Sequence, residues 1–274
     1  MILNTGSRTD IPAYFSDWFY KRIEEGYVMV RNPYYPEQVT RYVLNPSVVD
    51  VLVFCTKNLQ PMISRLERLS TYDMFWFVTI TPYGREIEPF VPPKEKVIES
   101  FRQLSEMTGR EKMSWRYDPV FITEKYSVDY HIACFAEMTE KLRGYTGQCV
   151  VSFLDLYEKT KRNFREARGV TRDEQERIIE AFAGIAEANG MQVPKKKTAR
   201  EACSCLLGAD IGVYNTCGHG CLYCYANYDR KSVEENRKRH DVNSPLLIGH
   251  LKETDHVKEA QQKSFKDTQM RLVL

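Results

Sequence analysis

Short apolar runs alternate with longer amphipathic segments along the first 190 residues of the chain. Short apolar runs bounded by polar residues predict strands; these are Ile2–Asn4, Val51–Cys55, Phe75–Thr81, Met113–Arg116 and Val150–Phe153. The longer segments have apolar residues three and four apart, which predicts helices; they cover residues 13–26, 58–70, 93–109, 130–144 and 171–190. The last segment begins with a Thr-x-x-Glu capping box, Thr171 to Glu174, and ends at Gly190.

Strands and helices in strict alternation indicate βαβ units and a parallel sheet. Five or six such units favour a TIM-like (βα) barrel, complete or partial, over an open sheet. We therefore expect an α/β fold in which residues 1–194 form the barrel. After Gly190 the alternation fades, and residues 195–274 are too poor in apolar residues to fold alone. We expect them to form a C-terminal, cysteine-bearing extension packed on the barrel.

Polar residues follow each predicted strand at its carboxyl end. In a barrel these positions share the face where substrates bind, so together they predict one polar pocket. Taken singly, each could instead cap a helix or form a salt bridge in a loop. As a set they give Asn58 as a candidate cofactor-binding residue, Asp155 as a further residue of the rim, and five candidate catalytic residues that orient substrate and cofactor: Arg8, Asp10, Lys57, Arg116 and Asp118.

The stretch "YNTCGHGCLYCYAN" holds three of the eight cysteines, Cys217, Cys221 and Cys224. The amino terminus has no secretory signal, and no window is apolar enough to span a membrane, so we expect a cytoplasmic protein. In a reducing compartment cysteines are thiols or metal ligands more often than disulfides. The other cysteines in apolar surroundings are better read as small buried hydrophobic residues: Cys55, Cys134 and Cys149.

Three kinds of site fit the spacing Cys217-x3-Cys221-x2-Cys224. A structural zinc site needs four ligands, so Cys203, Cys205 or His219 would complete it. A redox dithiol needs only a Cys-x-x-Cys pair and leaves Cys217 unexplained. A 4Fe–4S cubane takes one cysteine per iron and fits best, with one iron left for another ligand. Glycines 218 and 220 permit the backbone conformations that wrap such a loop tightly.

Cys205 is the first candidate for a fourth cluster ligand, which would close the site to other ligands. His219 lies inside the loop, and we expect it to face solvent rather than bind metal. The net charge of +2 is too small to argue for nucleic acid.

The three-cysteine loop, with Tyr223 before the third cysteine, resembles the motif of radical S-adenosylmethionine enzymes, most closely the branch containing spore photoproduct lyase. The resemblance implies that Cys217, Cys221 and Cys224 hold a 4Fe–4S cluster whose fourth iron chelates S-adenosylmethionine. It places Tyr223 beside the adenine. In ordinary members the loop follows the first barrel strand, whereas here it follows the last, which implies a permuted arrangement.

Over nearly its full length the chain resembles a prokaryotic family of unknown function that carries such a cysteine cluster near its C-terminus. The resemblance is carried by five stretches: "SRTDIP", "VLVFCTKN", "WRYDP", "DIGVYNTC" and "HDVNSPLLIGHL". It carries no established activity.

These interpretations of the cysteine loop lead to three hypotheses about function. The first is a radical S-adenosylmethionine-like enzyme with a small-molecule substrate and an electron donor such as ferredoxin or flavodoxin. The second is a closed cluster, with Cys205 as fourth ligand, for electron transfer or structural stabilisation. The third is a zinc-stabilised nucleic-acid-binding module, which we disfavour because such a module does not need a barrel mouth. No membrane partner is expected.

Overall fold

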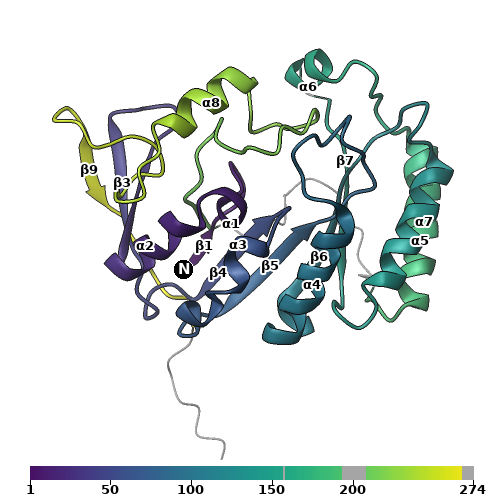
Figure 1. Cartoon of the computed structure of the whole chain (residues 1–274), viewed down its shortest axis with the longest axis horizontal. Coiled ribbons are helices and arrows are strands. Elements are labelled where there is room, and N and C mark those ends of the chain that lie inside the picture. The colour runs from purple at the N-terminus through teal and green to yellow at the C-terminus, as the bar shows by residue number, and fades with distance from the viewer. Residues whose placement is uncertain (157, 193–207, 267–274) are drawn as a thin grey trace, which may run out of the picture.

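The computed structural model describes residues 1–156, 158–192 and 208–266 (Figure 1). Its strands are β1 Ile2–Asn4, β2 Tyr27–Arg31, β3 Gln38–Val43, β4 Val51–Thr56, β5 Met74–Thr79, β6 Met113–Val120, β7 Cys149–Phe153, β8 Ala209–Asp210 and β9 His256–Glu259. Its α-helices are α1 Ile11–Tyr14, α2 Ser16–Glu25, α3 Gln60–Ile63, α4 Lys94–Thr108, α5 Val128–Lys141, α6 Glu158–Asn163, α7 Arg172–Ala188 and α8 Arg230–Lys238. Two 3-10 helices are η1 Leu66–Leu69 and η2 Arg110–Lys112.

The main sheet is parallel and has six strands in the order β7-β6-β5-β4-β1-β8. The five predicted strands are confirmed within a few residues at their ends, and so is the mixed α/β class. Helices flank this sheet, with α4, α5 and α7 beside it in Figure 1. No closed sheet is found among the described residues, since β7 and β8 form its two edges, so a barrel stays a prediction.

A second, smaller sheet interrupts the predicted alternation. It has the order β2-β3-β9, with β2 antiparallel to β3 and β3 parallel to β9. The prediction of strict alternation was therefore wrong between residues 27 and 43. The expected 13–26 helix is also two helices, because Phe15, between them, leaves helical geometry at φ −136° and ψ 26°.

The main core is aromatic and lies between the parallel sheet and its helices. Phe54 of β4 stacks on Trp76 of β5 with ring centroids 4.0 Å apart, and Phe135 of α5 stacks on Phe182 of α7 at 3.8 Å. Such pairs add specific geometry to the burial of large apolar surfaces. This packing holds in place the sheet whose strands carry polar residues at their carboxyl ends.

The capping box that we predicted at the start of α7 is confirmed. The Thr171 side chain accepts a hydrogen bond from the backbone of Glu174, and the Glu174 side chain accepts one from the backbone of Thr171. The reciprocal bonds satisfy two amide groups that the first helical turn leaves without partners. None of the described helices combines the length and the apolar character needed to cross a membrane.

Candidate functional site

A cavity of about 400 Å³ lies at the carboxyl ends of the parallel strands. The carboxyl-terminal residues of β4 to β7 and the segments that follow β1, β4 and β7 line it, together with the cysteine loop. In Figure 1 this loop and α8 lie above the end of the sheet to which the β4 and β5 arrows point. The lining includes eleven side chains of chemical interest: Asp10, Cys55, Lys57, Arg116, Asp118, Asp155, Cys217, His219, Cys221, Tyr223 and Cys224.

All three cysteines of the loop face this one cavity. The loop needs both of its glycines. Gly220 has φ +68°, a conformation that disfavours residues with a Cβ, and a Cβ at Gly218 would lie 2.8 Å from the ring of Tyr14. The predicted requirement for glycine is thus met, by backbone conformation at one position and by close approach at the other.

Backbone hydrogen bonds attach the cysteine loop to the segment after β5. The amide of Leu222 donates to the carbonyl of Ile87 at 3.0 Å, and the amide of Phe90 donates to the carbonyl of His219 at 3.2 Å. A small aromatic cluster reinforces the contact, because the Tyr223 ring lies 5.8 Å from that of Tyr83. The loop is therefore a packed part of the fold.

A buried network around Asp10 fixes one side of the loop. One Asp10 carboxylate oxygen accepts from the backbone amide of Lys57 at 2.8 Å and lies 2.8 Å from Nε2 of His219. The other oxygen accepts from the Ala13 amide and caps α1. Tyr14 contacts Nδ1 of His219 at 3.0 Å. Both contacts of the ring are satisfied when Nε2 carries the proton and Nδ1 accepts from the tyrosine.

His219 is 2% exposed, so the expectation that it faces solvent was wrong. Its burial has a physical reason, because Asp10 and Tyr14, which lie about 200 residues away in the sequence, satisfy both ring nitrogens. The histidine holds the loop against the ends of β1 and β4.

A second network is centred on Glu88, whose side chain is 3% exposed. One oxygen of its carboxylate lies 2.9 Å from Nζ of Lys57, accepts from the Thr81 hydroxyl at 2.7 Å, and accepts from the Tyr223 hydroxyl. Burial lowers the pKa of Lys57 and raises that of Glu88, but their mutual attraction, together with the hydrogen bonds that Glu88 accepts from Tyr223 and Thr81 and with other negative groups near Lys57, outweighs burial, so the pKa of Lys57 is raised and that of Glu88 is lowered. The pair is therefore ionised inside the protein.

The other predicted polar residues divide between two places. Arg116 forms an ion pair with Asp118, and the Ser152 hydroxyl donates to Asp118, all on the cavity wall. Arg8 does not line this cavity and pairs with Asp210 at 2.7 Å. Asn58 does not line it either, and its side-chain oxygen accepts from the Gln60 amide at 3.2 Å. The expected polar pocket therefore includes most of the predicted residues but not Arg8 or Asn58.

Cys205, the predicted fourth ligand, and Cys203 lie outside the described residues. Cys55, which we expected to be a buried hydrophobic residue, is only half-buried and lines the cavity as a fourth thiol. Cys134 and Cys149 are also half-buried.

The arrangement of the three thiols bears on which metal group they fit. Among the described residues, no three Cys, His, Asp or Glu side chains stand close enough to share one metal ion. A cubane gives each cysteine its own iron, so its ligands need to face one space rather than meet at a point. Burial raises the pKa of the Cys217 and Cys221 thiols, the latter to about 12. Iron would bind them by displacing their protons. Three thiols that face one cavity are the kind of donor set that a cubane takes.

Sequence reasoning missed two residues of this site, Glu88 and Tyr14. Glu86 and Glu88 stand two residues apart in the same predicted loop, and no sequence pattern separates them. Glu86 forms a surface ion pair with Lys125, whereas Glu88 is buried beneath the cysteine loop.

Gly6 brings the segment after β1 against β4 beside the cavity. A Cβ at this position would fall far inside contact distance of the Cβ and the carbonyl oxygen of Cys55. Gly6→Ala should therefore lower the free energy of unfolding by roughly 1–3 kcal/mol, measured by urea denaturation. Gly184→Ala is the matched control, since Gly184 lies exposed in α7 with open space around it and should gain about 0.5–1 kcal/mol. Equal stability of the Gly6→Ala and wild-type proteins would contradict the close approach.

The comparisons with known proteins return one family. Its description is "Domain of unknown function (DUF1848)", and it matches residues 2–195 and 192–226, which include all three cysteines of the loop. No curated protein and no solved structure matches the chain.

Proposed function

The chain belongs to this DUF1848 family of unknown function, and we propose from its site that it is an iron–sulfur protein that binds a 4Fe–4S cluster. Cys217, Cys221 and Cys224 are the proposed ligands. The observation that carries the proposal is that all three thiols face one cavity at the carboxyl ends of parallel strands. In α/β proteins this end of the sheet is where ligands and substrates bind.

We further propose that the protein is a radical S-adenosylmethionine-like enzyme. When bound, the cluster would supply the electron that cleaves S-adenosylmethionine to a 5′-deoxyadenosyl radical. The protein's own part is to bind, orient and shield. Arg116 and Asp118, already paired on the cavity wall, would bind carboxylate and ammonium groups, and Tyr223 would lie beside the adenine.

In this proposal the ionised pair of Lys57 and Glu88 anchors the cysteine loop and favours the thiolate form of one of its cysteines. Lys57 brings a positive charge near Cys221, and this charge lowers the pKa of that thiol against the effect of burial. A cationic group beside a cysteine ligand favours the thiolate that iron requires.

The strand order supports a partial barrel. Strands β4 to β7 follow β1 in sequence order across the sheet, and the late strand β8 returns to the other side of β1. A (βα) barrel whose strands follow one another in chain order has this strand order when its sheet is opened between the last two strands, here β7 and β8. A cytoplasmic location and an electron donor such as ferredoxin or flavodoxin belong to the same proposal.

A closed cluster for electron transfer or structural stabilisation is the second candidate. The observation that favours it is Cys55, a fourth thiol on the wall of the same cavity. If Cys55 or Cys205 bound the fourth iron, no iron would be left for S-adenosylmethionine.

The electron paramagnetic resonance spectrum of the reduced protein separates the two candidates. Protein purified without oxygen should contain about four irons and four sulfides per chain. Its spectrum should shift when S-adenosylmethionine is added, because a ligand then binds the open iron. Four irons without a shift would favour the closed cluster, and zinc without iron would overturn both.

A further inference from the structure

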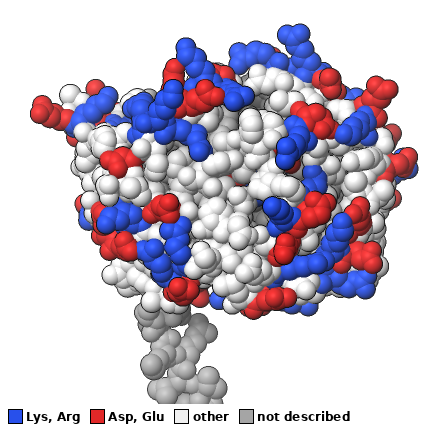
Figure 2. Space-filling model, viewed as in Figure 1, with Lys and Arg blue, Asp and Glu red and all other residues white. Residues whose placement is uncertain are grey.

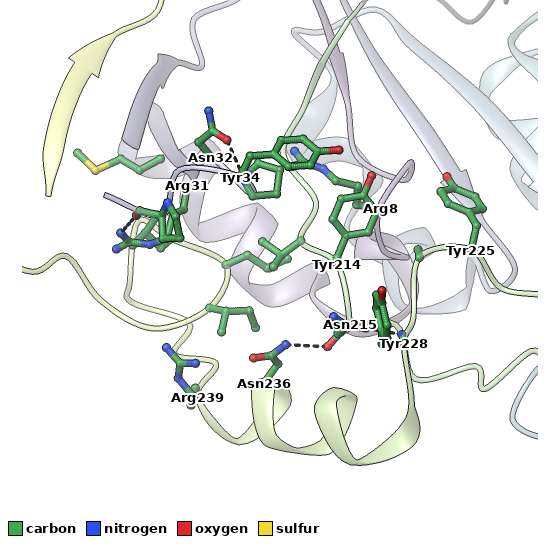
Figure 3. A pocket seen from close by; sticks show the side chains of 18 of the residues that line it. Arg8, Arg31, Asn32, Tyr34, Tyr214, Asn215, Tyr225, Tyr228, Asn236 and Arg239 are labelled. Carbon is green, nitrogen blue, oxygen red and sulfur yellow. Dashed lines mark hydrogen bonds between the residues drawn. The ribbon is translucent and has the colours of Figure 1, made fainter. Parts of the chain in front are cut away.

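A second and larger cavity, of about 640 Å³, lies beside the cysteine cavity. Tyr225 and Ala226, which directly follow the last cysteine of the loop, line both cavities. Figure 3 shows the second cavity between the turn that joins β2 to β3, which carries Asn32 and Tyr34, and helix α8, which carries Asn236. Its volume suits a small organic ligand, for which pockets of about 300–1,000 Å³ are usual.

Aromatic rings and an apolar floor shape this second cavity. Tyr34 is 82% exposed, and Tyr214 is half-buried on the segment that leads to the cysteines. The floor includes the buried residues Leu246 and Leu247. The exposed ring of Tyr34 and the half-buried ring of Tyr214, over which the Arg8 guanidinium lies at 5.7 Å, offer faces on which a planar ring can stack.

The charge of the second cavity is positive. Three arginines line it, and none of its lining residues among those described is acidic. Arg8 and Arg31 are each paired with a carboxylate, of Asp210 and Asp255 respectively. The Arg239 guanidinium has no hydrogen bond or ion pair with any other residue in the described ranges. Figure 2 shows Lys and Arg side chains over α8, the helix that Arg239 follows, with acidic side chains among them. An anion on the ligand would therefore bind at Arg239.

Side-chain amides add hydrogen-bonding groups around the same space. Asn236 donates through Nδ2 to the carbonyl of Asn215 at 3.1 Å, which fixes its side chain (Figure 3). The Asn32 side-chain oxygen accepts from the backbone amides of Tyr34 and Tyr35. Fixed amides of this kind can pair with the edge of a heterocyclic base.

We propose that the second cavity is a binding site for a nucleoside 5′-monophosphate or a close relative, with the base stacked on Tyr34 and Tyr214 and the phosphate at Arg239. Because Tyr225 and Ala226 form a common wall, a ligand bound here would lie next to the cysteine cavity. Its role as substrate rests on the proposed function, whereas its binding does not.

Isothermal titration calorimetry with AMP, GMP, CMP and UMP tests this site on the full chain. At least one of the four should bind with a Kd below about 1 mM. The matching nucleoside should bind several-fold more weakly, because it lacks the phosphate. Inorganic phosphate alone should not reach the affinity of the nucleotide.

Two pairs of variants connect the binding to the named residues. Tyr34→Ala should weaken binding by about tenfold, whereas Tyr35→Ala, on a neighbouring exposed residue that does not line the cavity, should leave it unchanged. Arg239→Gln should lower the affinity for the nucleotide to that for the nucleoside. Lys238→Gln, beside it but outside the cavity lining, should preserve the difference.

Failure of this site is distinguishable from failure of the cluster proposal. The three cysteines do not line the second cavity, so a Cys221→Ala protein should keep its nucleotide binding. The inference would be overturned if none of the four nucleotides bound with a Kd below about 1 mM. Equal effects of the two variants within either pair would also overturn it. Neither result would change the iron content of the protein.

Discussion

Cys221→Ala should remove most of the iron from protein purified without oxygen. Each cysteine of the loop is proposed to hold one iron, and a cubane that has lost a thiolate in a half-open cavity is readily lost. We expect about four irons per chain in the wild type and fewer than about one in the variant. Iron and sulfide are counted chemically on the purified protein.

Cys134→Ala is the matched control for this experiment. Cys134 is also a half-buried thiol, but it lies on α5 away from the cavity. It should keep the full iron content. Retention of iron by Cys221→Ala, or an equal loss in the two variants, would contradict the ligand assignment. Loss of iron from Cys55→Ala would identify the fourth ligand of a closed cluster.

Glu88→Ala should be the most destabilising change among the charged residues of the site. It leaves the Lys57 ammonium buried without its carboxylate, and removing one partner of a buried ion pair costs about 3–5 kcal/mol. The same change removes the acceptor of the Tyr223 and Thr81 hydroxyls. Thermal unfolding should shift down by roughly 6–12 °C, and the cysteine loop should lose an anchor.

Glu86→Ala provides the comparison, because Glu86 forms an ion pair with Lys125 at the surface and both side chains are at least half exposed, although this carboxylate also accepts from the Tyr126 hydroxyl. Such pairs contribute about 0–1 kcal/mol. The double variant Lys57→Met with Glu88→Leu should recover much of the lost stability, since it removes both charges together. Equal stability of Glu88→Ala and Glu86→Ala would show that the buried pair does not hold the loop.

Five strands of the main sheet, β1 and β4 to β7, could be predicted because they contain short apolar runs that pack against helices, whereas β8 has only two residues, Ala209 and Asp210, and carries no such pattern. The smaller sheet was missed. β2 and β3 are rich in Val and Tyr and carry a strand signal that our prediction did not use, whereas all four residues of β9 are exposed and neither periodicity nor apolar content marks that strand. β9 is defined by its pairing with β3, more than 200 residues earlier in the chain. Local sequence carries no signal for such a contact.

The candidate site shows the same limit. The cysteine spacing and the polar residues at the strand ends could be recognised in the sequence, because each is a local pattern. The environment of His219 was not, because it depends on Asp10 and Tyr14 from the other end of the chain. Glu88 was missed for the same reason, since its partners Lys57 and Tyr223 come from two distant segments.

The position of β1 in the sheet has a consequence for biosynthesis. Leu3 pairs with Leu52 on one side and with Ala209 on the other. At a ribosomal rate of about 5–20 residues per second, roughly 10–40 s separate the emergence of the first strand from that of its second partner. During that interval β1 presents an unpaired edge, and the cavity lacks the wall that carries its three thiols. The proposed cluster could therefore assemble only after residues 217–224 have been made, and until β8 has been made the open edge of β1 is a site at which nascent chains can pair with one another.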